Sequence, residues 1–202
     1  MLLRRRTRKI GTGALAAGLA GIGAALTLPV REKRATSNAT RLDEAMPVWE
    51  FDERHEIEIA AAPEAIFDAI RAIRADDIFL FRTFVNIRTA GCQTEENILN
   101  PSRDKPILDV ALQTGFFVMA DDTPREMVIG MVVMQPNRAI AAMNFRIDGN
   151  RLTTETRVHT TDAGARRRFA VYWRLIHPGS DIIRRMWLQA IRRRAEEGAS
   201  GG

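Results

Sequence analysis

The sequence predicts an α+β fold in which helices cover one face of an antiparallel sheet. Three observations support this class. Residues 49–59 alternate with period two, two hairpin patterns follow between residues 115 and 160, and an amphipathic helical pattern fills residues 165–197. Successive strands joined by tight turns pair antiparallel, and their apolar face needs a covering layer of helices. A domain of about 150 residues buries roughly 70% of its unfolded surface, enough for a core without disulfides or metal.

The first 30 residues predict a membrane-targeting segment. Basic residues between Arg4 and Lys9 precede the uncharged stretch Ile10 to Val30, whose 21 residues suit a bilayer core of about 30 Å. We expect an uncleaved single-pass anchor, because the sequence around Ala25 is a poor cleavage site; a secreted protein with a cleaved signal peptide is the alternative. The basic residues before the span favour an extracytoplasmic domain.

The polar residues 31–47 predict a linker, and the first strand follows at residues 49–59. One parity of this strand is apolar apart from His55 and Glu53, and the other is charged, which is typical of a strand with one face in water. We expect a helix to begin at Pro63, because proline suits the first helical position and Glu64 suits the positive end of the helix dipole.

Shorter elements fill the middle of the chain. We expect helical pieces at residues 78–87 and 106–114 with a polar loop at residues 91–105, and strands at residues 115–120, 126–134, 139–147 and 151–160. The turn Asp148-Gly149-Asn150 predicts a hairpin between the last two strands. Cys92 is the single cysteine of the chain, which excludes an intrachain disulfide.

The C-terminal helix carries an apolar stripe but contains Pro178-Gly179. Proline removes one intrahelical hydrogen bond and collides with the preceding turn, so we expect a kink or a split at this point. Gly198 is expected to end the helix and to leave residues 198–202 as a flexible tail.

Two stretches of this domain match a known pattern. One is Ile59-Ala-Ala-Ala-Pro63-Glu64-Ala-Ile66-Phe67, and the other joins Leu152-Thr-Thr-Glu155-Thr-Arg157-Val158 to Arg168-Phe169-Ala-Val-Tyr172-Trp173 and Pro178-Gly179-Ser180. With the order of elements, they make residues 48–197 resemble the START-like or SRPBCC superfamily of polyketide cyclases and plant allergens, in particular its uncharacterised bacterial members. The resemblance implies a helix-grip fold, in which an antiparallel sheet curves around a long C-terminal helix.

The resemblance also implies an apolar cavity between sheet and helix for lipids, polyketides, sterols or other hydrophobic ligands. Such folds host both binders and enzymes. The residues expected to line the cavity are Phe81, Phe84, Phe117, Met119, Met131, Met143, Phe145, Phe169, Tyr172 and Trp173. Methionine adapts to varied apolar shapes, which suits a permissive cavity, and ordinary core packing is the alternative.

The sequence favours binding over catalysis. It has no nucleophile elbow, no glycine motif that cradles phosphate and no metal-ligand spacing, so we expect no cofactor and no metal. His55 is expected to be a core residue. Glu155, Arg157 and His159 share one face of their strand and form either a polar clamp or a solvated outer face.

The charge distribution argues against a nucleic-acid partner. The net charge is +8 over residues 1–41, −9 over residues 42–162 and +6 over residues 163–202. No basic groove is therefore expected. The arginines of the last helix are expected to face outward, either toward anionic lipid headgroups or simply into solvent.

We therefore expect a membrane-tethered domain that binds a hydrophobic small molecule or a lipid. One alternative is a polyketide cyclase- or dehydratase-like enzyme that uses Tyr172, Glu155 or His159, and it requires these groups to point inward. A second is a cell-envelope interaction module that binds a protein through the basic helix face at Arg184 and Arg185. The sequence does not predict the oligomeric state.

Overall fold

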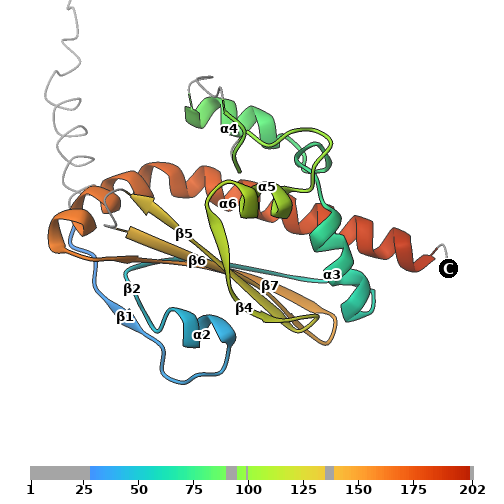
Figure 1. Cartoon of the computed structure of the whole chain (residues 1–202), viewed down its shortest axis with the longest axis horizontal. Coiled ribbons are helices and arrows are strands. Elements are labelled where there is room, and N and C mark those ends of the chain that lie inside the picture. The colour runs from blue at the N-terminus through green and yellow to red at the C-terminus, as the bar shows by residue number, and fades with distance from the viewer. Residues whose placement is uncertain (1–27, 90–94, 99, 135–138, 201–202) are drawn as a thin grey trace, which may run out of the picture.

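A five-stranded antiparallel sheet is crossed by one long C-terminal helix in the computed structural model, which describes residues 28–89, 95–98, 100–134 and 139–200 (Figure 1). The strands lie in the order β3 (Phe51–Glu58), β7 (Arg151–Thr160), β6 (Ala139–Asp148), β5 (Glu126–Met134) and β4 (Phe116–Asp122). The helix is α6 (Ala163–Ser200). This arrangement confirms the predicted α+β class, and its sheet order and C-terminal helix fit a helix-grip domain.

The shorter helices lie on the same side of the sheet as α6. They are α3 (Pro63–Ala72), the 3₁₀ turn η1 (Ala75–Asp77), α4 (Phe81–Thr89) and α5 (Ile107–Gln113). Pro63 stands at the predicted start of α3, and the buried side chains of Ile66, Phe67 and Ile70 form its apolar stripe. This stripe packs in the same core cluster as Trp187 and Ile191 of α6. The periodicity of the sequence therefore located these helices well.

Strand register places defined rows of side chains beneath α6. Directly opposed residues of an antiparallel pair point to the same side of the sheet. Three rows on the face toward α6 are Met131–Ala141–Val158–Phe51, Ile129–Met143–Thr156–Glu53 and Met127–Phe145–Thr154–His55. The predicted turn at Gly149 closes the β6–β7 hairpin with a positive φ of 62°, which glycine adopts without strain.

Residues 31–47 pack on the opposite face of the sheet, which corrects the prediction of a linker. They contain β1 (Lys33–Arg34) and α2 (Arg41–Ala45), and β2 (Val48–Trp49) follows and pairs with β1. Leu42 is fully buried and packs with Val128 and Ala142. The segment resembles a linker because many of its polar residues serve caps and ion pairs; Thr40, for example, forms a capping box with Asp43.

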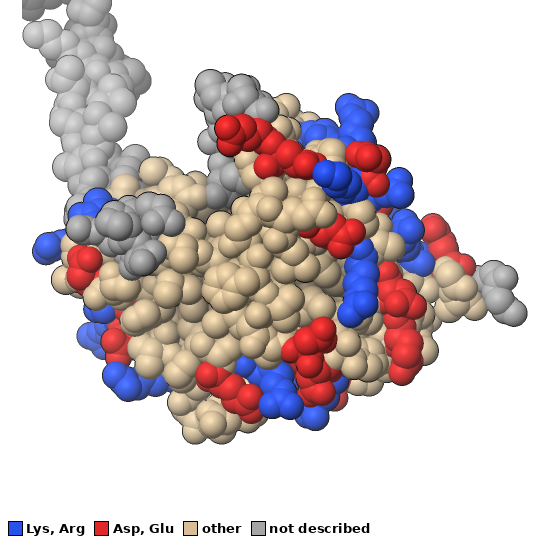
Figure 2. Space-filling view, in the orientation of Figure 1, with Lys and Arg blue, Asp and Glu red and all other residues tan. Residues whose placement is uncertain are grey.

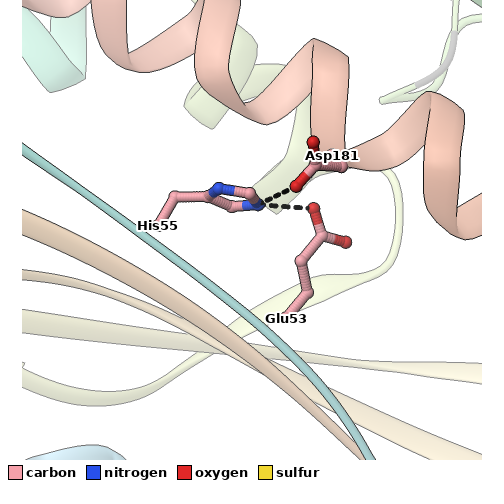
Figure 3. A group of neighbouring side chains, drawn as sticks. All are labelled: Glu53, His55 and Asp181. Carbon is pink, nitrogen blue, oxygen red and sulfur yellow. Dashed lines mark hydrogen bonds and ion pairs between the residues drawn. The ribbon is translucent and has the colours of Figure 1, made fainter.

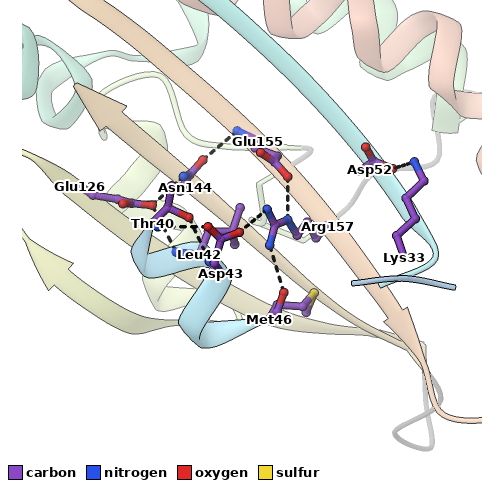
Figure 4. A network of polar contacts seen from close by, with 10 residues as sticks. All are labelled: Lys33, Thr40, Leu42, Asp43, Met46, Asp52, Glu126, Asn144, Glu155 and Arg157. Atoms are coloured by element: carbon purple, nitrogen blue, oxygen red, sulfur yellow. Dashed lines mark hydrogen bonds and ion pairs between the residues drawn. The ribbon is translucent and has the colours of Figure 1, made fainter. Parts of the chain in front are cut away.

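Arg157 joins α2 to the sheet through a buried polar network (Figure 4). Its guanidinium donates to Asp43 Oδ1 at 2.7 Å, to Glu155 Oε1 at 2.6 Å and to the Met46 carbonyl at 3.1 Å. It also lies 3.7 Å from the centre of the Trp49 ring. Burial works to raise the pKa of Asp43, but hydrogen bonds from Arg157 and Thr40 outweigh it and hold that pKa below its usual range.

The long helix α6 continues through Pro178, so the predicted split is wrong. All 38 residues are helical, although a proline inside a helix costs about 3 kcal/mol. Both halves of α6, before and after Pro178, pack against the sheet. Phe169 lies 4.9 Å from Phe51 between ring centres on one side of the proline, and Trp187 lies 5.5 Å from Phe145 on the other. The helix also runs through Gly198 to Ser200, where a tail was expected.

The predicted targeting segment lies almost wholly outside the described residues, as do Cys92 and the last two glycines. Within the described ranges, none of the helices combines the length and the apolar character needed to cross a bilayer. The anchor therefore stays a prediction from the sequence.

Asp43→Ala should lower the free energy of unfolding by about 3 kcal/mol, because it leaves the buried guanidinium of Arg157 short of one carboxylate. Urea unfolding of the full chain measures this loss. The native pKa of Asp43 is lowered, so its contribution is complete above the ordinary carboxyl pKa of about 3.9 and fades as pH falls further. Glu44→Ala, on the same helix but exposed, is the matched control and should cost less than about 1 kcal/mol. Equal losses in the two variants would contradict this role.

Candidate functional site

A cavity of about 380 Å³ lies between α6 and the inward face of the sheet. Its floor is formed by the first two cross-strand rows, at Met131, Ala141 and Met143 among others, and Phe81 of α4 closes one side. The small side chain of Ala141 stands between the larger Met131 and Val158 in its row, and this leaves room beneath the helix.

One stripe of α6 forms the roof of the cavity. Its residues Phe169, Trp173, Ile176, Ser180, Arg184 and Trp187 all line the space. They follow one another at intervals of three or four, which places them on one face of a helix. The uninterrupted course of α6 through Pro178 keeps the two halves of this stripe in line.

Six of the ten predicted cavity residues lie at the cavity wall, namely Phe81, Met131, Met143, Phe169, Tyr172 and Trp173. Their contact with a ligand stays a prediction. The tyrosine is 40% exposed, so it lies at the rim and does not anchor the core. The aromatic rings of this end pack on one another, with Phe169 and Tyr172 at 5.5 Å between ring centres.

The other four predicted cavity residues lie elsewhere. Phe145 is buried against Trp187 in the core, and Phe84 is half-buried on α4 without reaching the cavity. Phe117 and Met119 both pack over Gly130, where an added Cβ would meet the Met119 sulfur at 2.5 Å. Gly130 pairs with Ala142, which belongs to the outer cluster under α2. Phe116 takes the wall position instead, because a shift of one residue along a strand changes the face.

Arg184 lies in the cavity wall, which corrects the prediction that the arginines of this helix face outward. It donates to Thr156 Oγ1 at 3.0 Å and contacts the sulfur of Met143. Burial lowers the pKa of Arg184, and the negative charge of Glu53 acts in the opposite direction. Arg185, one residue further, is exposed and forms two hydrogen bonds with Asp181.

Glu53, His55 and Asp181 form a second polar group beside the cavity (Figure 3). His55 Nε2 lies 2.8 Å from Glu53 Oε1 and 3.5 Å from Asp181 Oδ1. Glu53 and His55 are both buried on β3, whereas Asp181 reaches them from α6. Sequence analysis placed His55 correctly in the core but missed this group. The signal was Glu53, the one acid on the apolar parity of its strand.

The donor atoms of this group lie within 4.8 Å of one another, which is compatible with a divalent cation. The surrounding charges argue otherwise. Asp181 already accepts two hydrogen bonds from Arg185, Glu53 is bonded to His55, and Glu53 also interacts electrostatically with Arg184. A divalent ion beside two carboxylates and two guanidinium groups would leave an excess of positive charge in a largely buried space. The group fits a hydrogen-bonded cluster better than a metal site.

Two of the proposed catalytic residues point away from the cavity. Glu155 bonds Arg157 on the outer face, and His159 Nδ1 lies 3.6 Å from Glu50 on the same face. Of the three groups that the enzyme alternative requires, Tyr172 alone reaches the cavity. His177 lies within α6 and contacts the ring of Trp173.

Charged side chains gather along the edges of the face shown in Figure 2, where acidic and basic residues are interspersed around a broad uncharged centre. No single-sign patch forms on this face, so it offers no basic track of the kind that follows a nucleic-acid backbone.

Comparisons with known proteins give limited similarity. No family model and no curated protein matches the chain. Some solved structures do match. One is CalU16 from Micromonospora echinospora, with 15% identity over 85% of this chain and 96% of that chain and a TM-score of 0.32. Another is TTHA0849 from Thermus thermophilus, with 12% identity over 75% of this chain and 100% of that chain and a TM-score of 0.29. These scores carry no argument about function, and the fold class rests on the sheet and α6 themselves.

Glu53→Ala should lower the free energy of unfolding by about 1–3 kcal/mol, because it leaves the buried His55 without its nearest acceptor. Glu53→Gln keeps an acceptor oxygen and should cost less. Asp181→Ala breaks a more exposed pair and should cost less than about 1 kcal/mol. Thermal and urea unfolding of the three variants rank them, and a Glu53→Ala variant as stable as wild type would exclude this role.

Proposed function

We propose that this chain is a START-like domain that binds one hydrophobic small molecule or lipid in the cavity beneath α6. The observation that carries the proposal is the cavity itself, whose wall combines aromatic rings, methionines and aliphatic side chains with a few polar groups. Such a composition is typical of sites for apolar ligands, in which a small number of polar groups set the orientation.

The size of the cavity indicates the size of the ligand. Its 380 Å³ lies near the lower end of the range of about 300–1,000 Å³ found for small-molecule sites. A compound with one acyl chain or a compact ring system suits this volume better than a two-chain phospholipid. Burial of the apolar surface of such a ligand supplies the driving force for binding.

We further propose that residues 1–30 attach the domain to a membrane. The first described residues support this arrangement, because they lie beside one end of the cavity. The Leu28 carbonyl accepts a hydrogen bond from Arg174 at 2.6 Å, and Val30 packs in the cluster that contains Phe169 and Trp173. An anchor within residues 1–30 would hold this end of the cavity close to the bilayer, where hydrophobic ligands are concentrated.

Ala141→Phe should prevent ligand binding, because the added ring would occupy the space beneath α6. The full-length chain is purified from cells, and native mass spectrometry is combined with organic extraction of the same sample. Wild type should carry a discrete apolar compound, and the variant about tenfold less of it. Thr153→Phe adds similar bulk on the outer face of β7 and serves as the matched control that keeps its ligand.

The proposal fails if wild type has a bare polypeptide mass that persists after incubation with a panel of fatty acids, sterols and polyketides. It also fails if Ala141→Phe carries as much ligand as wild type. Unchanged thermal stability of the variant would show that the ring fills existing space and does not disrupt the core.

A further inference from the structure

Arg184 is a partly buried cation without an ion-pair partner among the described residues. Its polar contacts are the neutral Thr156 hydroxyl and the sulfur of Met143, and its guanidinium also lies 5.4 Å from the centre of the Trp187 ring. Guanidinium has five N–H donors, and these two contacts leave most of them available. Desolvation of such a group is costly unless an anion approaches it.

The neighbouring carboxylates are already engaged with other groups. Glu53 is hydrogen-bonded to His55, and Asp181 forms two hydrogen bonds with Arg185. Glu53 therefore acts on Arg184 at longer range. Neither carboxylate forms an ion pair with Arg184, so its positive charge is left for an incoming anion to neutralise.

Further hydrogen-bond donors belong to residues of the wall near Arg184. The indole Nε1–H of Trp187 is buried and has no partner in the described part of the chain. Ser180 lies one helical turn before Arg184 and lines the same space, and the hydroxyl of Thr156 accepts from Arg184, which leaves its own hydrogen free to donate. A wall of donors around one cation complements a group that only accepts, such as an ionised acid.

We propose that the ligand is a single-chain amphiphile with an acid group, which binds to Arg184 while the chain runs along α6 toward Trp173. This inference rests on the proposed function of the cavity and names the class of ligand. Trp173 and Arg184 both line the cavity, and their separation along the helix is about 16 Å at 1.5 Å per residue. A medium-length acyl chain spans this distance.

A matched pair of brominated probes tests the acid group. They are 11-bromoundecanoic acid and 11-bromo-1-undecanol, which differ in the head group alone. Bromine at the chain end quenches tryptophan fluorescence at short range, and Trp173 and Trp187 line the cavity whereas Trp49 lies on the outer face beneath Arg157. Titration of the full-length chain near neutral pH, where an acid of ordinary pKa is ionised, gives both affinities.

Arg184→Met keeps the length of the side chain and removes its charge. The affinity for the acid should fall by about tenfold or more, as expected for the loss of a hydrogen bond to a charged group. The affinity for the alcohol should change by less than about twofold. The matched control is Arg185→Met, which alters the exposed neighbour and should leave both affinities unchanged. In a chain that keeps Arg184, Trp173→Phe should remove most of the quenching, because the brominated end of the probe lies at that tryptophan.

The outcomes separate this inference from the proposed function. If neither probe quenches wild type, the cavity does not bind such ligands and the proposed function fails with the inference. If both probes bind wild type with equal affinity and Arg184→Met changes neither affinity, the proposed function is supported and the acid-binding role of Arg184 is wrong. Thermal unfolding of each variant checks that a loss of affinity does not reflect a loss of fold.

Discussion

The structure depends on the burial of one sheet face beneath α6. An antiparallel sheet has two faces, and each face either packs against other elements or carries polar side chains exposed to solvent. Here the helix covers the inward face along its length, while α2 and the strands before it cover much of the outer face. The cover over the inward face is incomplete because Ala141 is small and because Arg184 enters the wall as a charged group. The same contact therefore forms the core and leaves the cavity.

Local patterns in the sequence predicted the elements well, since strand alternation, helix starts and turns are properties of short segments. The β6–β7 hairpin and the start of α3 at Pro63 are examples. Three features depended on distant parts of the chain and could not be predicted. Residues 31–47 pack on the sheet and contact Arg157, α6 continues past Pro178, and Phe116 lines the cavity in place of Phe117.

The candidate site was predicted less well than the fold, because composition identifies apolar side chains but not the face on which they lie. Six aromatic and methionine residues reached the wall, and four did not. The polar groups were harder still. Glu53 on an apolar strand parity was a visible anomaly, but its relation to Asp181 and Arg184 needed the helix to be placed over the sheet. A buried acid in an apolar pattern is a local signal of a polar partner elsewhere in the chain.

The pairing of β3 with β7 has a consequence for how the chain folds. The first strand of the sheet pairs with its last strand, and α2 bonds to Arg157, 114 residues after Asp43. Ala60 likewise contacts Glu196 across 136 residues. Contacts this distant delay folding, because long loops must close before the contacts form. During synthesis, the first strand and α2 must wait until the C-terminal hairpin has emerged, so the early part of the chain exposes its apolar surfaces for most of translation.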